Sequence, residues 1–103
     1  MIYNYETLAK AAKHSLHNYQ EIRNSVICGC YYCQSIFKAD VIQPDYDVMP
    51  DVGGYTVFCP YCEIDAVIGD YSGFPITNDF LSEMYDYAFS SVRLSDSYKK
   101  PTE

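Results

Sequence analysis

Two short stretches, CYYC at residues 30–33 and CPYC at residues 59–62, decide how this chain of 103 residues can fold. Two residues between a pair of cysteines allow a tight turn that aims both sulfur atoms at one point. Two such turns facing each other supply four thiolates in a tetrahedron, the ligand set of a structural zinc site. Strand-like residues flank both pairs, as in a zinc ribbon. The spacing therefore predicts one structural zinc ion with four ligands: Cys30, Cys33, Cys59 and Cys62.

A fifth cysteine leaves a second choice for the first ligand pair. Cys28 and Cys33 have four residues between them, which a zinc site also allows, whereas Cys30 and Cys33 have the usual spacing of two. We favour Cys30 and expect Cys28 to be a small buried apolar residue. A redox role for a Cys-x-x-Cys pair would need a βαβ context, which the sequence does not predict.

A helix is predicted on each side of the cysteine pairs. In residues 3–22, apolar side chains recur at spacings of three and four, which places them on one helix face. Thr77 is a suitable N-cap for a second helix at residues 78–90, and a polar tail is expected at residues 95–103. The predicted apolar faces are Tyr5, Leu8, Ala12, Leu16, Tyr19 and Ile22 in the first helix and Phe80, Leu81, Met84 and Ala88 in the second.

The 25 residues between the cysteine pairs exceed the roughly 15–20 that are typical of such sites. Segment 44–54 contains two prolines, three aspartates and two glycines, so we expect an exposed acidic loop there. Residues 26–68 are expected to form the zinc-ribbon-like strands. The whole chain, 1–103, is therefore predicted to be one zinc-stabilised α+β domain, with a small zinc-ribbon-like antiparallel β-sheet, an N-terminal helix and a C-terminal helix.

Charge is distributed unevenly along the chain. Residues 39–98 contain eleven acidic side chains and one basic side chain, Arg93, and the whole chain has twelve tyrosines. Acidic groups steer a basic partner and tyrosines supply rigid contact area, so the pattern favours a protein-interaction module with a basic protein partner. A solvated acidic face that binds nothing is the alternative interpretation. The residues predicted to contact the partner are Asp70, Tyr71, Asp79, Glu83, Tyr85 and Asp86, and Asp45 and Asp47 are counted in the same acidic surface.

Two other functional classes fit the sequence less well. A nucleic-acid-binding zinc ribbon is the alternative function, but the net charge of −7 disfavours contact with phosphates. An enzyme is not expected, because sulfur can fill all four metal positions and no nucleophile–base pair stands out. Glu63 and Asp65, close to the second cysteine pair, are interpreted as solvated loop carboxylates.

The composition also bears on location. No apolar run approaches the roughly 18 residues that a membrane span requires. The first residues, MIYNYETLAK, lack the basic and apolar regions of a signal peptide. The sequence therefore predicts a cytoplasmic protein with no membrane contact, in a compartment where thiols stay reduced.

The cysteines belong to a longer motif. The chain has C-G-C-x-x-C at residues 28–33, C-P-x-C at 59–62, and D-x-V-I-G-x-x-S-G-x-P-I at 65–76, followed by a helix. Over about residues 25–89 this combination resembles a group of small bacterial proteins usually called only "cytoplasmic protein". The resemblance implies a zinc-ribbon-like module of unassigned activity. It also implies an inhibitor or immunity protein as one form of the interaction module, because some relatives lie in toxin–immunity or phage-related gene neighbourhoods.

Overall fold

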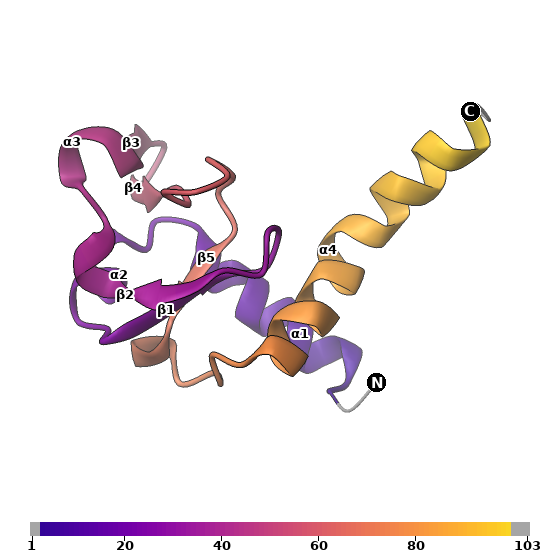
Figure 1. The fold of residues 1–103 in the computed structure, drawn as a ribbon, viewed down its shortest axis with the longest axis horizontal. Helices are drawn as coiled ribbons and strands as arrows, with labels where there is room; N and C mark the ends of the chain where they lie inside the picture. The colour runs from indigo at the N-terminus through magenta and orange to yellow at the C-terminus, as the bar shows by residue number, and fades with distance from the viewer. Residues whose placement is uncertain (1–2, 100–103) are drawn as a thin grey trace.

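The computed structural model describes the backbone of residues 3–99 and the side chains of residues 3–89. Helices and small antiparallel sheets form an α+β fold with a helix at each end, which confirms the predicted fold class (Figure 1). The elements in chain order are α1 Tyr5–Ala12, η1 Lys13–Ser15, α2 Tyr19–Arg23, β1 Ile27–Cys30, β2 Ile36–Lys38, η2 Ala39–Val41, α3 Pro44–Asp47, β3 Val48–Asp51, β4 Gly54–Val57, β5 Val67–Gly69, η3 Asp70–Ser72 and α4 Asn78–Lys99.

Two antiparallel sheets present the cysteines. In the first sheet β1 lies between β2 and β5, and in the second β3 and β4 form a hairpin. Cys30 ends β1, and Cys33 lies in the turn that leads to β2. Cys59 and Cys62 lie between β4 and β5. The first cysteine pair therefore comes from a hairpin turn of the first sheet, and the second pair comes from the segment that joins the two sheets.

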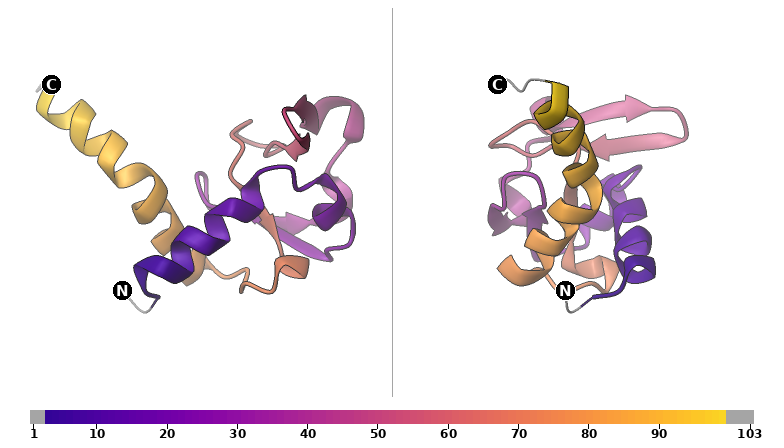
Figure 2. Two further views of the ribbon diagram at one scale, coloured as in Figure 1. Left: turned by 180° about the vertical axis from the view of Figure 1, so that it is seen from behind. Right: turned by 90° about the vertical axis from the view of Figure 1, so that its right-hand side faces the viewer.

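The hydrophobic core lies between the first sheet and the two long helices. Figure 2 shows that α1 and α4 begin close together and diverge toward their C-terminal ends, and the two helices contact each other. Gly29 in β1 permits a close approach of this strand to α4, because a Cβ there would lie 2.9 Å from the Leu81 side chain. The largest fully buried side chains include Leu8, Ile22, Val57, Val67, Ile68, Phe80, Leu81 and Met84.

The predicted helix at residues 3–22 is wrong as one continuous element. The helical chain ends at Leu16, whose backbone is extended, and His17 has a positive φ of 50°. Leu16 of the predicted apolar face lies at the interruption and is 46% exposed, and Tyr5, the first residue of α1, is exposed as well. Leu8 and Ile22 of the same face are buried, as expected.

The buried Asn18 gives a physical reason for this interruption. Its side-chain Nδ2 donates to the carbonyl of Val67 at 2.8 Å, and its Oδ1 accepts the backbone N–H of Val57 at 2.9 Å. These bonds tie the α1–α2 connection to β5 and β4. A continuous helix would leave buried polar groups without partners, which costs more than the helical bonds lost in the connection.

Segment 44–54 differs from the predicted loop. It contains α3, β3 and the turn into β4, and the β3–β4 ladder runs from the Val48–Val57 pair to the Asp51–Gly54 pair. Gly53 has a φ of 99° and Gly54 has a φ of 158°, so a glycine is favoured in the left-handed region that closes this hairpin. Val52 and Gly53 form the turn of this hairpin, and Gly54 begins β4, so the glycine pair that indicated a loop lies at a hairpin turn.

The last helix begins as predicted and continues further than predicted. The hydroxyl oxygen of Thr77 accepts the backbone N–H of Phe80 at 3.2 Å, which confirms the N-cap. The helix continues to Lys99 instead of ending near residue 90, since no glycine or proline interrupts it before Pro101. The tail predicted from residue 95 is therefore helical to residue 99, and residues 100–103 lie outside the described residues. In the described part of the chain, none of the helices has the length and apolar character needed to cross a membrane.

Candidate metal centre

The two cysteine pairs lie in turns with the same backbone hydrogen bonds. We name residues 30–35 the first knuckle and residues 59–64 the second knuckle. In the first, the N–H of Gln34 donates to the carbonyl of Cys30 at 2.8 Å, and Cys30 N–H donates to the carbonyl of Ser35 at 2.9 Å. In the second, Glu63 and Cys59 repeat this pattern at 2.9 and 3.0 Å, with Ile64 as the acceptor for Cys59. The two Cys-x-x-Cys pairs therefore form turns of the same kind.

A residue with a left-handed backbone closes each knuckle. Gln34 has a φ of 70° and Glu63 has a φ of 66°, and each residue follows the second cysteine of its pair. This conformation costs a non-glycine residue roughly 1–2 kcal/mol. The shared strain indicates that the turn geometry is imposed by the cysteine pair and its surroundings, since neither side chain favours it.

Backbone amides point at the first sulfur of each knuckle. The N–H groups of Tyr61 and Cys62 donate to Cys59 Sγ at 3.3 and 3.4 Å. The N–H groups of Tyr32 and Cys33 likewise lower the pKa of Cys30, against the effect of its burial. Amide donors stabilise a thiolate, and a thiolate is the form of cysteine that binds metals.

The two knuckles bring four sulfur atoms together. The Sγ atoms of Cys30 and Cys62 lie 3.6 Å apart, those of Cys33 and Cys59 lie 3.7 Å apart, and all four lie within 4.8 Å of one another. A tetrahedral site with Zn–S bonds near 2.3 Å has sulfur atoms about 3.8 Å apart. All five cysteines of the chain are free thiols. The four predicted ligands could therefore hold a metal ion in a tetrahedral site.

The thiols of the cluster differ in acidity. Burial raises the pKa of Cys62 to about 11, and it also raises the pKa of Cys30. Burial acts in the same direction on Cys33. There, however, hydrogen bonds from the hydroxyl and the backbone N–H of Ser35 and from the Cys59 and Cys30 thiols lower the pKa to about 7. A divalent metal that binds here must displace protons from the other thiols, because thiolates are its ligands.

Packing around the first knuckle attaches it to α4. The Nε2 of Gln34 donates to the carbonyls of Tyr31 and Leu81, both at 3.1 Å. Tyr31 is 4% exposed, and its hydroxyl donates to the Ser15 oxygen at 3.0 Å. The ring of Tyr32 lies 5.0 Å from that of Phe89, edge to face. Helix, core and cysteine turn therefore form one packed unit.

The second knuckle is less enclosed. Tyr61 is 61% exposed, and the centre of its ring lies 5.6 Å from that of Phe37 in β2. Cys59 is fully buried, whereas Cys62 is half-buried. The two buried sulfurs, Cys30 and Cys59, are thus the first cysteines of their knuckles, and the two second cysteines lie nearer to solvent.

Cys28 lies outside the cluster. It is fully buried in β1, opposite Phe37 and Gly69 in the neighbouring strands, and the four-sulfur group does not include it. Burial raises the pKa of its thiol to about 12, with a smaller contribution from Asp70. This placement agrees with the prediction of a small buried apolar residue.

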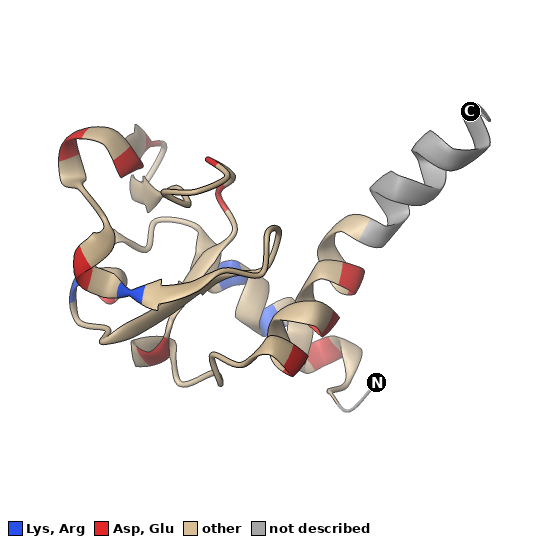
Figure 3. Cartoon of the chain, viewed as in Figure 1, with Lys and Arg blue, Asp and Glu red and all other residues tan. Residues whose placement is uncertain are grey.

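The residues predicted to contact a partner are spread over two elements. Asp70 and Tyr71 lie in η3, apart from the first turns of α4, which carry the others (Figure 3). Asp70 Oδ1 accepts the N–H of Val26 at 2.9 Å, and a Glu83 carboxylate oxygen accepts the N–H of Tyr3 at 3.0 Å. Both carboxylates therefore hold the backbone of the described chain in place.

The other members of the predicted set differ in exposure. Tyr71 and Asp79 are exposed, and so is Asp86. Tyr85 is half-buried, with its ring 5.8 Å from that of Tyr32 and 5.4 Å from that of Phe89. The structure therefore does not bring the six residues together as one exposed face.

Three acidic residues around the β3–β4 hairpin, Asp51, Glu63 and Asp65, were not singled out as contact residues by the sequence analysis. Asp47, Asp51, Glu63 and Asp65 line two neighbouring cavities there. The signal that could have found them is the Gly53-Gly54 pair between two short runs with β-branched or aromatic residues, 48–52 and 55–58, which is typical of a hairpin. Without the hairpin, Asp51 has no reason to lie near Asp65, nor Asp47 near Glu63.

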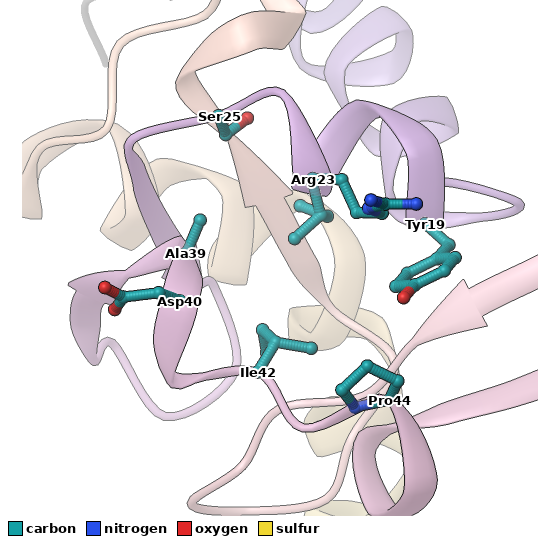
Figure 4. Close-up of a pocket in the computed structure, with 8 residues that line it drawn as sticks. Tyr19, Arg23, Ser25, Ala39, Asp40, Ile42 and Pro44 are labelled. Atoms are coloured by element: carbon teal, nitrogen blue, oxygen red, sulfur yellow. The ribbon is translucent and has the colours of Figure 1, made fainter.

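A cavity of about 260 Å³ lies at α2 and η2, away from the cysteines. Figure 4 shows its mixed lining, with Tyr19, Arg23 and Asp40 among apolar side chains. It contains no cysteine or histidine. Asp40 supplies the one carboxylate of this lining, so the cavity does not offer the three or four ligands that a transition-metal site needs.

Comparison with known proteins found no match to a family model, a curated protein or a solved structure. The resemblance based on the cysteine and loop motifs therefore stays a prediction. The structure itself gives the fold of the chain and the arrangement of the four sulfur atoms.

Proposed function

We propose that this protein is a small acidic zinc-binding protein whose metal ion stabilises the fold and whose surface binds a basic protein partner. The observation that carries the proposal is the sulfur cluster, with separations of 3.6 and 3.7 Å between sulfurs of different knuckles. Residues far apart in the sequence reach these positions through two matching turns.

Zinc is the metal that best suits this ligand set. Four thiolates in a tetrahedron are a common structural zinc site, and zinc has no redox chemistry that would endanger the thiols. Since sulfur fills all four positions, no position is left for a water or a substrate, so the role we propose is structural and not catalytic. Four thiolates in this geometry also bind iron, and metal analysis of the purified protein distinguishes iron from zinc.

The proposed partner follows from the charge. Leaving Glu83 and Asp86 aside, the acidic side chains of the described residues form ion pairs only with histidines, His14–Glu21 at 2.9 Å and His17–Asp51 at 4.0 Å. Exposed acids of this kind raise the association rate with a basic protein and repel nucleic acid. On the motif resemblance, we propose an inhibitor or immunity protein of the cytoplasm as the specific form of this role.

Two measurements test this function. Protein purified without added metal should contain one zinc per chain. A partner should then be captured from the native host, identified, purified and mixed again with the pure protein. We expect a basic partner whose association rate falls steeply as salt rises. If no basic protein binds the zinc-loaded chain at low salt, the interaction role is wrong, whereas the metal centre would still stand.

A further inference from the structure

The β3–β4 hairpin and the second knuckle enclose a groove on the surface. Two cavities of about 280 and 380 Å³ lie there, and both are lined by Met49 and Phe58. Pro50 and Thr56 also line the first cavity, and Tyr46, Cys59 and Pro60 also line the second. Because the two cavities share lining residues, we treat them as two ends of one groove, which we name the hairpin groove.

The floor of the hairpin groove is apolar. Met49 is 53% exposed although it is a large apolar side chain, and Phe58 beside it is half-buried. Tyr46, at the second end, is exposed as well. Exposed apolar side chains that gather in one concave place, instead of lying singly, are typical of a surface that binds another molecule.

Two carboxylates border each end of this floor. Asp51 and Asp65 line the first end, and Asp47 and Glu63 line the second. Asp47 accepts the N–H of Gln43 at 2.8 Å, and Asp51 accepts the N–H of Val52 at 2.7 Å. These bonds fix the position of two of the four carboxylates.

The remaining two carboxylates face solvent. Glu63 and Asp65 are exposed, and within the described residues neither of them forms an ion pair with a lysine or arginine. The groove therefore has an apolar centre and carboxylates at both ends, and within the described residues the one basic side chain at ion-pair distance from them is that of His17, 4.0 Å from Asp51.

Pairing of strands is a poor way to bind here. Pro50 lies within β3 and has no N–H to offer, so β3 is not a good template for an added strand. A molecule in the hairpin groove must be recognised by its side chains. A polyanion such as RNA is repelled by the four carboxylates, which favours a basic protein segment over nucleic acid.

We propose that the hairpin groove docks a segment of a partner protein in which one apolar side chain lies between basic side chains. The apolar side chain occupies the floor at Met49 and Phe58, and lysine or arginine side chains on either side meet the carboxylate pairs at the two ends. This inference rests on the proposed function, since it gives the basic partner a place on the molecule. It moves the interface from η3 and α4 to the hairpin and the second knuckle.

The test uses two short peptides, acetylated and amidated, that carry a leucine or a serine between two pairs of lysines. Amide shifts of the zinc-loaded, isotope-labelled full chain report where each peptide binds. We expect the leucine peptide to shift residues around Met49 and Phe58 and to bind at least about tenfold more tightly than the serine peptide. Equal binding of the two peptides, no binding of either, or shifts confined to α4 would each overturn the docking proposal.

Matched variants sharpen the result. Met49→Ser should weaken leucine-peptide binding about tenfold, whereas Val52→Ser, at the exposed hairpin tip outside the groove, should leave it unchanged. Glu63→Gln with Asp65→Asn should weaken binding at low salt and flatten its salt dependence. Asp40→Asn with Asp79→Asn removes the same charge elsewhere on the surface and should have little effect. Equal loss in both double variants would mean that net charge, and not the groove, attracts the peptide.

The outcome can be separated from that of the proposed function. A purified basic partner that binds the chain, but binds Met49→Ser and the Glu63/Asp65 variant as well as it binds the original, refutes the hairpin groove and leaves the interaction role intact. A leucine peptide that binds as expected supports the groove even before any partner is known.

Discussion

The first and second knuckles have the same turn in very different surroundings. In each knuckle one backbone N–H donates to the carbonyl of the cysteine four residues earlier. The residue that donates it, Gln34 or Glu63, has a left-handed backbone. The first knuckle is packed under α4 through Tyr31 and Tyr32, whereas the second exposes Tyr61 and borders the hairpin groove. Local spacing therefore determines the metal-binding turn, and packing with distant elements determines what each turn is used for.

From this difference we infer that the two knuckles have different roles. The first attaches the metal centre to the hydrophobic core, so changes around it should affect stability. The second knuckle lies at the protein surface beside the hairpin groove, so changes around it should affect binding of a partner more than stability. Only removal of a cysteine ligand should destabilise the protein to the same extent in both knuckles.

The largest expected effect comes from removing one ligand from either knuckle. Structural zinc contributes on the order of 10 kcal/mol to the folding of small zinc domains. Cys33→Ala and Cys59→Ala should therefore lose the metal and most of the folded signal to the same extent, as measured by metal content and circular dichroism. Cys28→Ala should keep one metal per chain, because Cys28 lies outside the sulfur cluster. Full metal retention in either ligand variant would refute the site.

The next effect separates the two knuckles. Tyr31→Ala should lower the free energy of unfolding by about 3–5 kcal/mol, because it empties a buried aromatic position and removes the hydrogen bond to Ser15. Tyr61→Ala should cost less than about 1 kcal/mol, since that ring is mostly exposed. Urea unfolding of the zinc-loaded proteins measures both. Similar losses in the two variants would show that the knuckles are supported alike.

Asn18 supports the second knuckle from a distance. It accepts the N–H of Val57, two residues before Cys59, and donates to Val67 in β5. Asn18→Ala leaves these buried backbone groups without their partners and should destabilise the protein by about 2–4 kcal/mol. Asn24→Ala is a suitable control, because Asn24 is exposed at the end of α2. A loss below that of the control in urea unfolding would contradict the role given to Asn18.

The smallest effect concerns the left-handed residues. Glu63→Gly should raise the free energy of unfolding by about 0.5–1 kcal/mol, because glycine adopts this φ without strain. Gln34→Gly should bring no gain, since it also loses the side-chain bonds to Tyr31 and Leu81. Melting temperatures of the two variants test this contrast, and a gain at residue 34 equal to that at residue 63 would contradict it.

How much the sequence could predict depends on the range of the interactions involved. The cysteine turns, the Thr77 cap and the α+β class follow from local spacing and local residue preferences, and the structure agrees with them. The break after Leu16 could not be predicted, because it depends on bonds from Asn18 to strands 39 and 49 residues further along the chain. The groove was missed for the same reason, since Asp51 and Asp65 line one cavity, and Asp47 and Glu63 the other, only after the hairpin folds back.

X-ray absorption at the metal edge of the native protein, purified without added metal, tests the central claim most directly. We predict one zinc per chain with four sulfur neighbours near 2.3 Å, the distance of a four-thiolate site. Loss of one sulfur neighbour in Cys59→Ala, with no change in Cys28→Ala, would assign the ligands. A protein that folds without metal, or a metal shell with nitrogen or oxygen in place of sulfur, would contradict the account.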